Sequence, residues 1–291
     1  MRGKPGKGSP TSRLATALAG LFLLLILVGL AVRFWVTERV YDFTGPVHIS
    51  ASGSDIFINA SGDLLRLSAS GELLEIKSLR DAGLPADPID LRLLGNSRLL
   101  VAGQRPATID ICDTDSWSCS PLPGPSIDSI QRQFKILPEA KPGNWLLTDA
   151  RGDALWRLDE SAAELQEVLP RKILAGANGL AFDEDGIPWV ADTDNRRIVE
   201  LLAAENGQFV IGREHSAVND LTIGKRHFPM LIERGPKGRW WIAQAADFSQ
   251  ALSDLVIYDS DEGVVEVVTL PVNAYATDLT VSGGNVLVTD L

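Results

Sequence analysis

The stretch Asn178-Gly-Leu-Ala-Phe-Asp-Glu-Asp-Gly-Ile-Pro-Trp-Val-Ala-Asp-Thr-Asp-Asn-Arg-Arg-Ile198 decides the fold. It contains two short apolar segments on either side of a tight turn at residues 183–186, a pattern typical of a β-hairpin. Two further apolar segments follow, at 198–202 and 207–211. Four short strands within about 35 residues predict one blade of a β-propeller.

A related sequence pattern recurs along the whole chain. Each copy has a turn with Gly, Asn or Ser, then three or four apolar residues, and usually a small or acidic residue at the end. The six copies are spaced by 44, 46, 43, 52 and 46 residues, and they end at Asn59, Gly103, Asp149, Asp192, Gln244 and Asp290. A period of about 40–50 residues made of short strands is typical of propeller blades.

These repeats account for nearly all of the 291 residues. Six blades of about 45 residues require no second folded domain. We therefore predict an all-β protein in which residues 37–291 form a six-bladed β-propeller, preceded by one N-terminal transmembrane helix. The last repeat stops after its second strand, and we expect the segment 38–43 to supply a strand that closes the ring.

The predicted transmembrane anchor covers residues 14–36. Residues 14–32 carry no charge, and as a helix they would extend roughly 28 Å, about the thickness of the bilayer core. Residues 1–13 contain four basic residues and no acidic ones, which predicts a cytoplasmic tail and a propeller on the periplasmic or extracellular side. A cleaved signal peptide is the alternative, with a small-residue site at residues 29–31.

The charge balance excludes one class of partner. The formal net charge is −11, and the segment 1–39 is basic, so the predicted propeller is more acidic than the whole chain. An acidic surface repels nucleic acid, so we predict no nucleic-acid partner. Membrane contact is expected through the single span only, and the protein or small-molecule ligand is not identified by composition.

The two cysteines, Cys112 and Cys119, lie between two strand-like stretches, at 108–111 and 120–122. This places them at the two ends of a hairpin loop, where the loop joins its strands. In an extracytoplasmic domain a local disulfide is the expected outcome. No other thiol is available for a zinc site.

Two blades carry a family resemblance. The stretch 178–198 resembles an NHL repeat and also the corresponding blade of the SMP-30/gluconolactonase propellers. The stretch Phe228-Pro-Met-Leu-Ile-Glu-Arg-Gly-Pro-Lys-Gly-Arg-Trp-Trp-Ile-Ala243 is similar to a blade of the strictosidine-synthase-like group, which includes members anchored by one N-terminal span. The resemblance extends over roughly residues 40–291 and implies a six-bladed propeller.

The resemblance also implies a metal site, whose residues are mostly replaced here. SMP-30 lactonases bind a divalent metal through a Glu before Gly-Pro, the Asn of Asn-Gly-Leu and an Asp after Pro, and oxygen ligands of this kind suit calcium. In this chain the Asn is present as Asn178, but Thr44 and Met230 stand at the other two positions. The Glu that strictosidine synthase needs is replaced by Thr277, one residue before Asp278.

Other polar residues precede or begin inner strands and could complete a site at the mouth of the channel. A carboxylate cluster there would bind calcium, whereas turn and strand-cap roles require no ligand. The sequence leaves open which of the two holds, and it identifies no catalytic residue. The candidate ligand-binding residues are His48, Asp90, Asn178, Asn219, Asp220 and Asp278, with Asn178 as the candidate metal ligand.

Two functions follow. The first is a membrane-anchored binding or scaffold module that has lost most of the metal ligands of its enzymatic relatives. The alternative is a metal-dependent hydrolase of the SMP-30 type, a lactonase or esterase with a rearranged site. Carboxylates that converge at the channel would favour the hydrolase, whereas a channel filled with side chains would favour the binding module.

Overall fold

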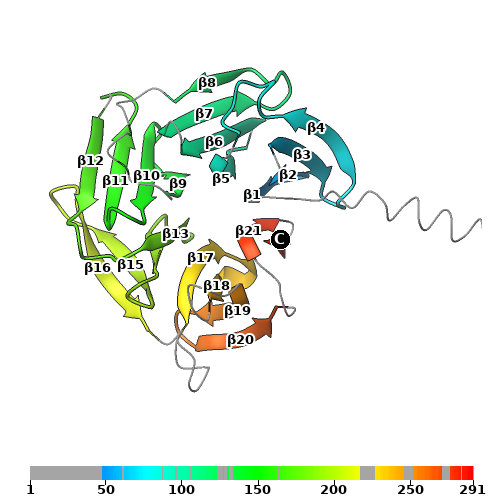
Figure 1. Cartoon of the computed structure of the whole chain (residues 1–291). Coiled ribbons are helices and arrows are strands. Elements are labelled where there is room, and N and C mark those ends of the chain that lie inside the picture. The colour runs from blue at the N-terminus through cyan, green and yellow to red at the C-terminus, as the bar shows by residue number, and fades with distance from the viewer. Residues whose placement is uncertain are drawn as a thin grey trace, which may run out of the picture. The chain divides into compact units, whose positions relative to one another are not determined.

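The computed structural model shows a β-propeller (Figure 1). It describes residues 48–290 except 61, 87, 96, 105–106, 123–126, 128–129, 131–133, 163, 217–226, 246–251, 271–275 and 283. Within these residues there are five four-stranded antiparallel sheets and one two-stranded sheet, β21–β22. The prediction of an all-β propeller is confirmed, but the prediction of six full blades is wrong. Among the described residues five blades have four strands, and the sixth repeat has two.

The strands follow one another in chain order within each sheet. Their bounds are β1 His48–Ser52, β2 Asp55–Ala60, β3 Asp63–Ser68, β4 Leu73–Ser78, β5 Pro88–Leu93, β6 Arg98–Gln104, β7 Ala107–Asp113, β8 Cys119–Pro121, β9 Ile136–Pro138, β10 Asn144–Asp149, β11 Ala154–Asp159, β12 Glu164–Leu169, β13 Ala177–Phe182, β14 Pro188–Asp192, β15 Arg197–Ala203, β16 Phe209–His215, β17 Phe228–Arg234, β18 Trp240–Ala245, β19 Leu252–Asp259, β20 Gly263–Thr269, β21 Ala276–Ser282 and β22 Asn285–Asp290.

The first strand of each sheet lies at the centre of the ring (Figure 1). These inner strands are β1, β5, β9, β13, β17 and β21. β1 packs against β5 on one side and β21 on the other, while β13 lies between β9 and β17. In a ring of six inner strands, β5 is therefore opposite β17, and β9 is opposite β21. We call the six sheets blades 1 to 6 in chain order.

The stretch that predicted the fold forms blade 4. Its hairpin pairs Phe182 with Pro188, and the turn places Gly186 at φ +77°, a conformation that favours glycine. All five residues of β14 are buried, as expected for a strand covered on both faces. The predicted strand order of this blade is confirmed.

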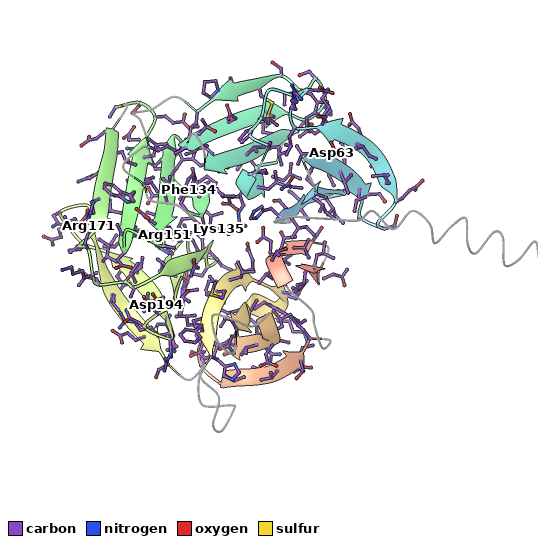
Figure 2. All side chains as sticks on the ribbon, viewed as in Figure 1. Asp63, Phe134, Lys135, Arg151, Arg171 and Asp194 are labelled. Carbon is purple, nitrogen blue, oxygen red and sulfur yellow. A yellow bond between two sulfur atoms is a disulfide. The ribbon has the colours of Figure 1, made fainter. Side chains whose placement is uncertain are left out.

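Apolar side chains fill the spaces between neighbouring sheets (Figure 2). Trp189 of blade 4 packs against Trp240 of blade 5, with ring centroids 4.9 Å apart, and both side chains are fully buried. Between blades 1 and 2, Phe57 packs with Leu99 and with Cys112, which forms the predicted disulfide with Cys119. Contacts of this kind contribute to holding neighbouring blades together.

Four inner strands contain a β-bulge at the same place in the repeat. In each, one extra residue faces the second strand of the blade without a partner of its own. The extra residues are Ile89, Asn178, Met230 and Thr277. All four are partly exposed, whereas Asp90, Gly179 and Asp278, which directly follow three of them, are buried. The bulge thus gives two successive residues different surroundings.

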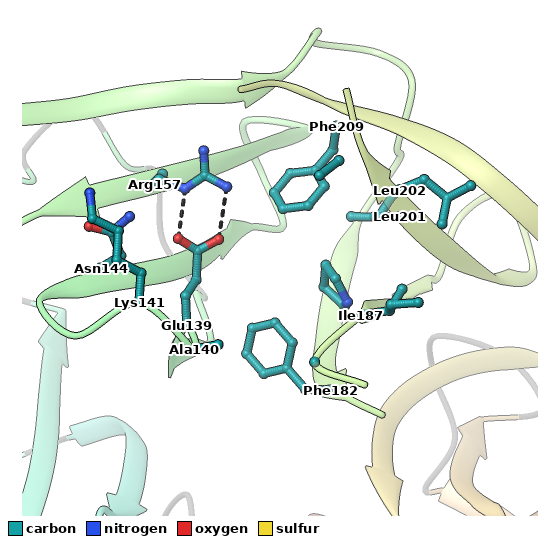
Figure 3. A pocket seen from close by; sticks show the side chains of 13 residues that line it. Glu139, Ala140, Lys141, Asn144, Arg157, Phe182, Ile187, Leu201, Leu202 and Phe209 are labelled. Carbon is teal, nitrogen blue, oxygen red and sulfur yellow. Dashed lines mark hydrogen bonds and ion pairs between the residues drawn. The ribbon is translucent and has the colours of Figure 1, made fainter. Parts of the chain in front are cut away.

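Two other observations bear on function. A pocket lies between blades 3 and 4 (Figure 3), lined by residues from both. No helix in the part of the chain that the structure describes is long and apolar enough to cross a membrane. The predicted tail 1–13, the predicted anchor 14–36 and the closing segment 38–43 all lie outside the described residues.

Candidate functional site

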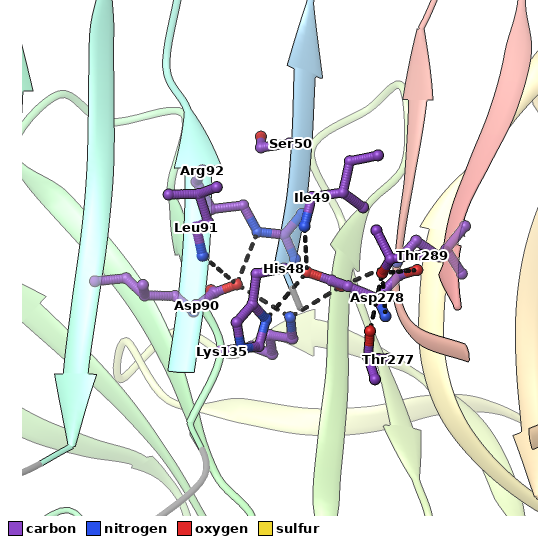
Figure 4. Close-up of polar contacts among 12 residues, drawn as sticks. His48, Ile49, Ser50, Asp90, Leu91, Arg92, Lys135, Thr277, Asp278 and Thr289 are labelled. Carbon is purple, nitrogen blue, oxygen red and sulfur yellow. Dashed lines mark hydrogen bonds and ion pairs between the residues drawn. The ribbon is translucent and has the colours of Figure 1, made fainter. Parts of the chain in front are cut away.

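Charged side chains from four of the six inner strands, and from the residue immediately before a fifth, meet at the centre of the ring (Figure 4). Most of them are at least nine-tenths buried, so each charge needs a partner. The members of this central network are His48 of β1, Asp90 and Arg92 of β5, Lys135 immediately before β9, Glu233 of β17 and Asp278 of β21.

Lys135 holds two carboxylates together. Its Nζ lies 3.0 Å from Oδ1 of Asp90, in the neighbouring blade, and 3.1 Å from Oδ1 of Asp278, in the opposite blade. Figure 4 shows the ammonium group between the two carboxylates. The Lys135 side chain therefore spans the central channel.

Lys135 and Asp278 occupy equivalent places in their repeats. The backbone N–H of each donates a hydrogen bond of 3.0 Å to a threonine hydroxyl on the second strand of the same blade, Thr148 in one case and Thr289 in the other. Asp90 has the same position in blade 2, where it pairs with Ala102. The equivalent positions of three blades thus supply one cation and two anions.

The two aspartates also bind the backbone of the next blade. Oδ2 of Asp90 accepts a hydrogen bond of 2.9 Å from the Ile136 N–H, and Oδ2 of Asp278 accepts one of 3.3 Å from the Ile49 N–H. His48 Nδ1 lies 3.3 Å from the same oxygen of Asp278. Each carboxylate therefore links two blades in addition to binding Lys135.

A second bridge crosses the channel further along the same strands. Arg92 Nη1 donates a hydrogen bond of 2.5 Å to Glu233 Oε1, which joins opposite blades 2 and 5. The Arg92 Nε also lies 3.4 Å from Oδ1 of Asp90, so the two bridges share a carboxylate. Together they fill the centre of the ring with paired charges.

The burial of these pairs shifts their pKa values in ways that follow from their contacts. Burial raises the pKa of Asp278, but the nearby Lys135 ammonium and the His48 ring outweigh burial and hold that pKa well below its ordinary value. Burial lowers the pKa of Lys135, but Asp278 and Asp90 outweigh it and leave the pKa raised. Burial raises the pKa of Glu233 more than Arg92 lowers it.

The network contains a set of atoms that resembles a metal site. One donor atom from each of His48, Asp90 and Asp278 lies within 4.8 Å of the others. However, the Lys135 ammonium is within hydrogen-bond distance of both carboxylates and already supplies the positive charge between them. Calcium takes 6–8 oxygen ligands, and two carboxylates that already bind an ammonium do not provide them. The residues present do not fit a calcium ion.

Asn178, the candidate metal ligand, does not belong to the central network. Its Nδ2 donates hydrogen bonds to Thr193 Oγ1 at 2.8 Å and to the Gly176 carbonyl at 3.2 Å. It also lies 3.9 Å from Met230 Sδ in the next blade. Asn178 stands at the bulge of β13, and its side chain binds its own blade, apart from Asp90 and Asp278.

The remaining candidate site residues form two groups, those in the central network and those outside the described residues. His48, Asp90 and Asp278 lie together in the central network. Asn219, Asp220 and Thr44 lie outside the described residues. Sequence reasoning missed Lys135, Arg92 and Glu233, because the loops between the first and second strands differ in length from blade to blade and hide the equivalence of Lys135 with Asp90 and Asp278.

Comparisons with known proteins show the fold. No known family profile matches the chain, and no curated protein matches its sequence. Virginiamycin B lyase from Staphylococcus aureus has a similar structure, with 15% identity over 85% of this chain and 78% of the lyase and a TM-score of 0.56. Regucalcin, a calcium-binding protein from Agrobacterium tumefaciens, is 15% identical over 85% of each chain, with a TM-score of 0.57. YCF48, bound to a D1 peptide, is 17% identical over 86% of this chain and 76% of its own, with a TM-score of 0.52.

These neighbours define the class, which is a β-propeller of the kind found in regucalcin and virginiamycin B lyase. Their identities are too low to carry an activity to this chain. A lyase, a calcium-binding protein and a peptide-bound protein share the architecture, so function has to be argued from the residues at the site.

Proposed function

We propose that this chain is a non-enzymatic binding module: a β-propeller whose central site is closed by its own side chains and whose outer surfaces bind a partner. The observation that carries the proposal is the Lys135 ammonium, which lies between Asp90 and Asp278 at 3.0 and 3.1 Å. It supplies the positive charge between the two carboxylates, where a metal ion bound by His48, Asp90 and Asp278 would have to lie.

The chemistry of the central network supports a structural role. A catalytic lysine needs a pKa lowered toward neutrality, so that the free amine can act as a base or nucleophile. The pKa of Lys135 is raised instead. Arg92 and Glu233 neutralise each other, and both aspartates are occupied by backbone N–H groups. None of these four groups is left to act on a substrate.

A metal-dependent hydrolase of the SMP-30 type is the second candidate. It is favoured by one observation, the three donor atoms of His48, Asp90 and Asp278 within 4.8 Å. It requires the Lys135 ammonium to leave both carboxylates, and it requires an accessible channel. The first proposal requires neither change.

We also propose that residues 14–36 anchor the chain in the cytoplasmic membrane, with the propeller on the periplasmic or extracellular side. The apolar run and the basic tail support the anchor. The Cys112–Cys119 disulfide supports the location, because disulfides persist mainly in oxidising compartments. Alkaline phosphatase fused after residue 291 tests this directly, since the fusion is active only outside the cytoplasm.

Calorimetric titration of the full-length protein in detergent with calcium, manganese and zinc tests the function. We expect no stoichiometric binding at the centre of the ring and no change in melting temperature with a chelator. Binding of one ion that is abolished by Asp278→Asn would contradict the binding-module proposal and support the hydrolase. The matched control is Asp185→Asn, which changes an exposed carboxylate in a turn.

A further inference from the structure

The pocket between blades 3 and 4 has a volume of about 350 Å³, at the lower end of the range for small-ligand sites. All of its lining residues are among those that the structure describes. Blade 3 contributes Glu139, Lys141, Asn144 and Arg157, and blade 4 contributes mainly apolar residues. The pocket therefore has one polar wall and one apolar wall.

The polar wall contains the ion pair Arg157–Glu139, which several hydrogen bonds hold in place. Arg157 donates hydrogen bonds of 2.7 and 2.8 Å to the two oxygens of Glu139, and a third of 2.8 Å to the Gly207 carbonyl of blade 4. Its guanidinium also lies 5.1 Å from the centroid of the Phe209 ring. Because Arg157 and Glu139 neutralise each other, they contribute shape and rigidity to the pocket, with no net charge.

One further polar group of this wall, the Lys141 ammonium, is available to a ligand. Lys141 is exposed, and its nearest carboxylate, Asp159, lies 3.7 Å away in a solvent-exposed pair. Such a pair is weak and is easily exchanged for another carboxylate. Asn144 is only 8% exposed, and its Oδ1 accepts no hydrogen bond within the described part of the chain. This oxygen has no accessible surface, so Asn144 contributes to the shape of the wall and Lys141 provides its charge.

The opposite wall is apolar. It consists of Phe182, Ile187, Leu202 and Phe209, and the Leu202 side chain is 41% exposed. Figure 3 shows Phe182, Leu202 and Phe209 across the pocket from the Arg157–Glu139 pair. Burying one hydrophobic side chain of a ligand against this wall would stabilise the complex by about 1.5–3 kcal/mol.

We propose that this pocket binds an extended peptide segment in which a large hydrophobic residue is followed by an acidic one. The hydrophobic side chain fits the apolar wall, and the carboxylate pairs with Lys141. Charge complementarity supports the acidic residue, since the lining carries two basic side chains and one acidic one in a chain of net charge −11. The inference rests on the proposed binding role and gives it a location and a partner class.

The test uses methyl-labelled full-length protein and short capped peptides. Acetyl-Gly-Phe-Asp-Gly-amide is expected to shift the methyl signals of Ile187 and Leu202 in a saturable way, with a dissociation constant on the order of 1 mM. Acetyl-Gly-Ala-Asp-Gly-amide is expected to give no saturable shift, and acetyl-Gly-Phe-Lys-Gly-amide to bind several-fold more weakly. Lys141→Glu should reverse the preference between the Asp and Lys peptides.

Leu202→Asp should abolish the saturable methyl shifts that acetyl-Gly-Phe-Asp-Gly-amide causes. Its matched control is Leu74→Asp, which places the same change on β4 at an apolar side chain that is 53% exposed and remote in sequence from the pocket. Dispersed methyl spectra of both variants show that they are folded. Binding that survives Leu202→Asp, equal binding of the Asp and Lys peptides, or no saturable shift with the Phe-Asp peptide would each overturn the proposal. The metal titrations described above are independent of these results, so failure here leaves the closed centre intact.

Discussion

The Nζ of Lys135 lies 3.1 Å from Oδ1 of Asp278 although the two residues are 143 positions apart and belong to opposite blades. They stand at equivalent places in the repeat, each bound through its backbone N–H to a threonine of the second strand. The same position of the repeat thus holds a cation in blade 3 and an anion in blade 6, and the two face each other across the ring.

Lys135→Met tests the contribution of this bridge to stability. The change leaves Asp90 and Asp278 buried without their shared cation, and removing one partner of a buried ion pair costs about 3–5 kcal/mol. Thermal and denaturant unfolding should both show the loss. Lys141→Met is the matched control, because that side chain is exposed, and it should change the free energy of unfolding by less than about 1 kcal/mol. Equal effects of the two substitutions would contradict the assigned role of Lys135.

The stability of the propeller should fall in acid partly through Asp278. Its pKa in the folded chain is held below the ordinary value of 3.8. The ionised carboxylate therefore stabilises the folded state above that value, and the contribution is lost as the pH falls further, through the folded pKa. Unfolding measured between about pH 2 and pH 6 should show a shallower acid decline in Asp278→Asn than in the unchanged protein. Parallel profiles for the two proteins would be inconsistent with the depressed pKa.

A double-mutant cycle tests the second bridge. Arg92→Met alone leaves Glu233 buried without its cation, and Glu233→Gln alone leaves Arg92 without its carboxylate. We expect the double variant to be more stable than the sum of the two single effects predicts, by about 1–3 kcal/mol, as is typical for residues in one buried network. Additive effects would show that Arg92 and Glu233 do not interact. Arg239 and Asp259, a more exposed pair at 3.8 Å, provide a comparison cycle with little coupling.

The Cys112–Cys119 disulfide should add less to the free energy of unfolding than the Lys135 bridge does. It closes a short loop with a sequence separation of 7, for which the chain-entropy estimate is about 2 kcal/mol. Melting with and without a reducing agent should show a modest fall in melting temperature, and Cys112→Ser/Cys119→Ser should no longer respond to the reductant. An unchanged melting temperature on complete reduction would show that packing of the buried Cys112 side chain maintains the hairpin.

The repeated apolar segments predicted the fold because the strands of each blade are consecutive in the sequence. The four strands of blade 4 lie close to where the turn residues and apolar segments of 178–211 place them. The sequence predicted that the last repeat stops after its second strand, and β21 and β22 are the strands of that repeat that the structure describes. The predicted closing segment 38–43 stays a prediction, because it lies outside the described residues.

The site was only partly predictable, for a geometric reason. Asp90 and Asp278 were identified as inner-strand carboxylates, and the structure places His48 beside them. Which side chains face one another across the ring depends on the bulges and on loop length, and neither is encoded in the repeat spacing. The bulge separates Asn178 from Asp90 and Asp278, and the long connection before β9 concealed the equivalence of Lys135.

The most direct test of the closed centre is a crystal structure of the protein grown with manganese, with an anomalous difference map. We predict that Lys135 Nζ lies between Asp90 and Asp278, as in Figure 4, with no anomalous peak within coordination distance of either carboxylate. A strong peak bound by His48, Asp90 and Asp278, with Lys135 turned away, would contradict the account and establish a metal centre.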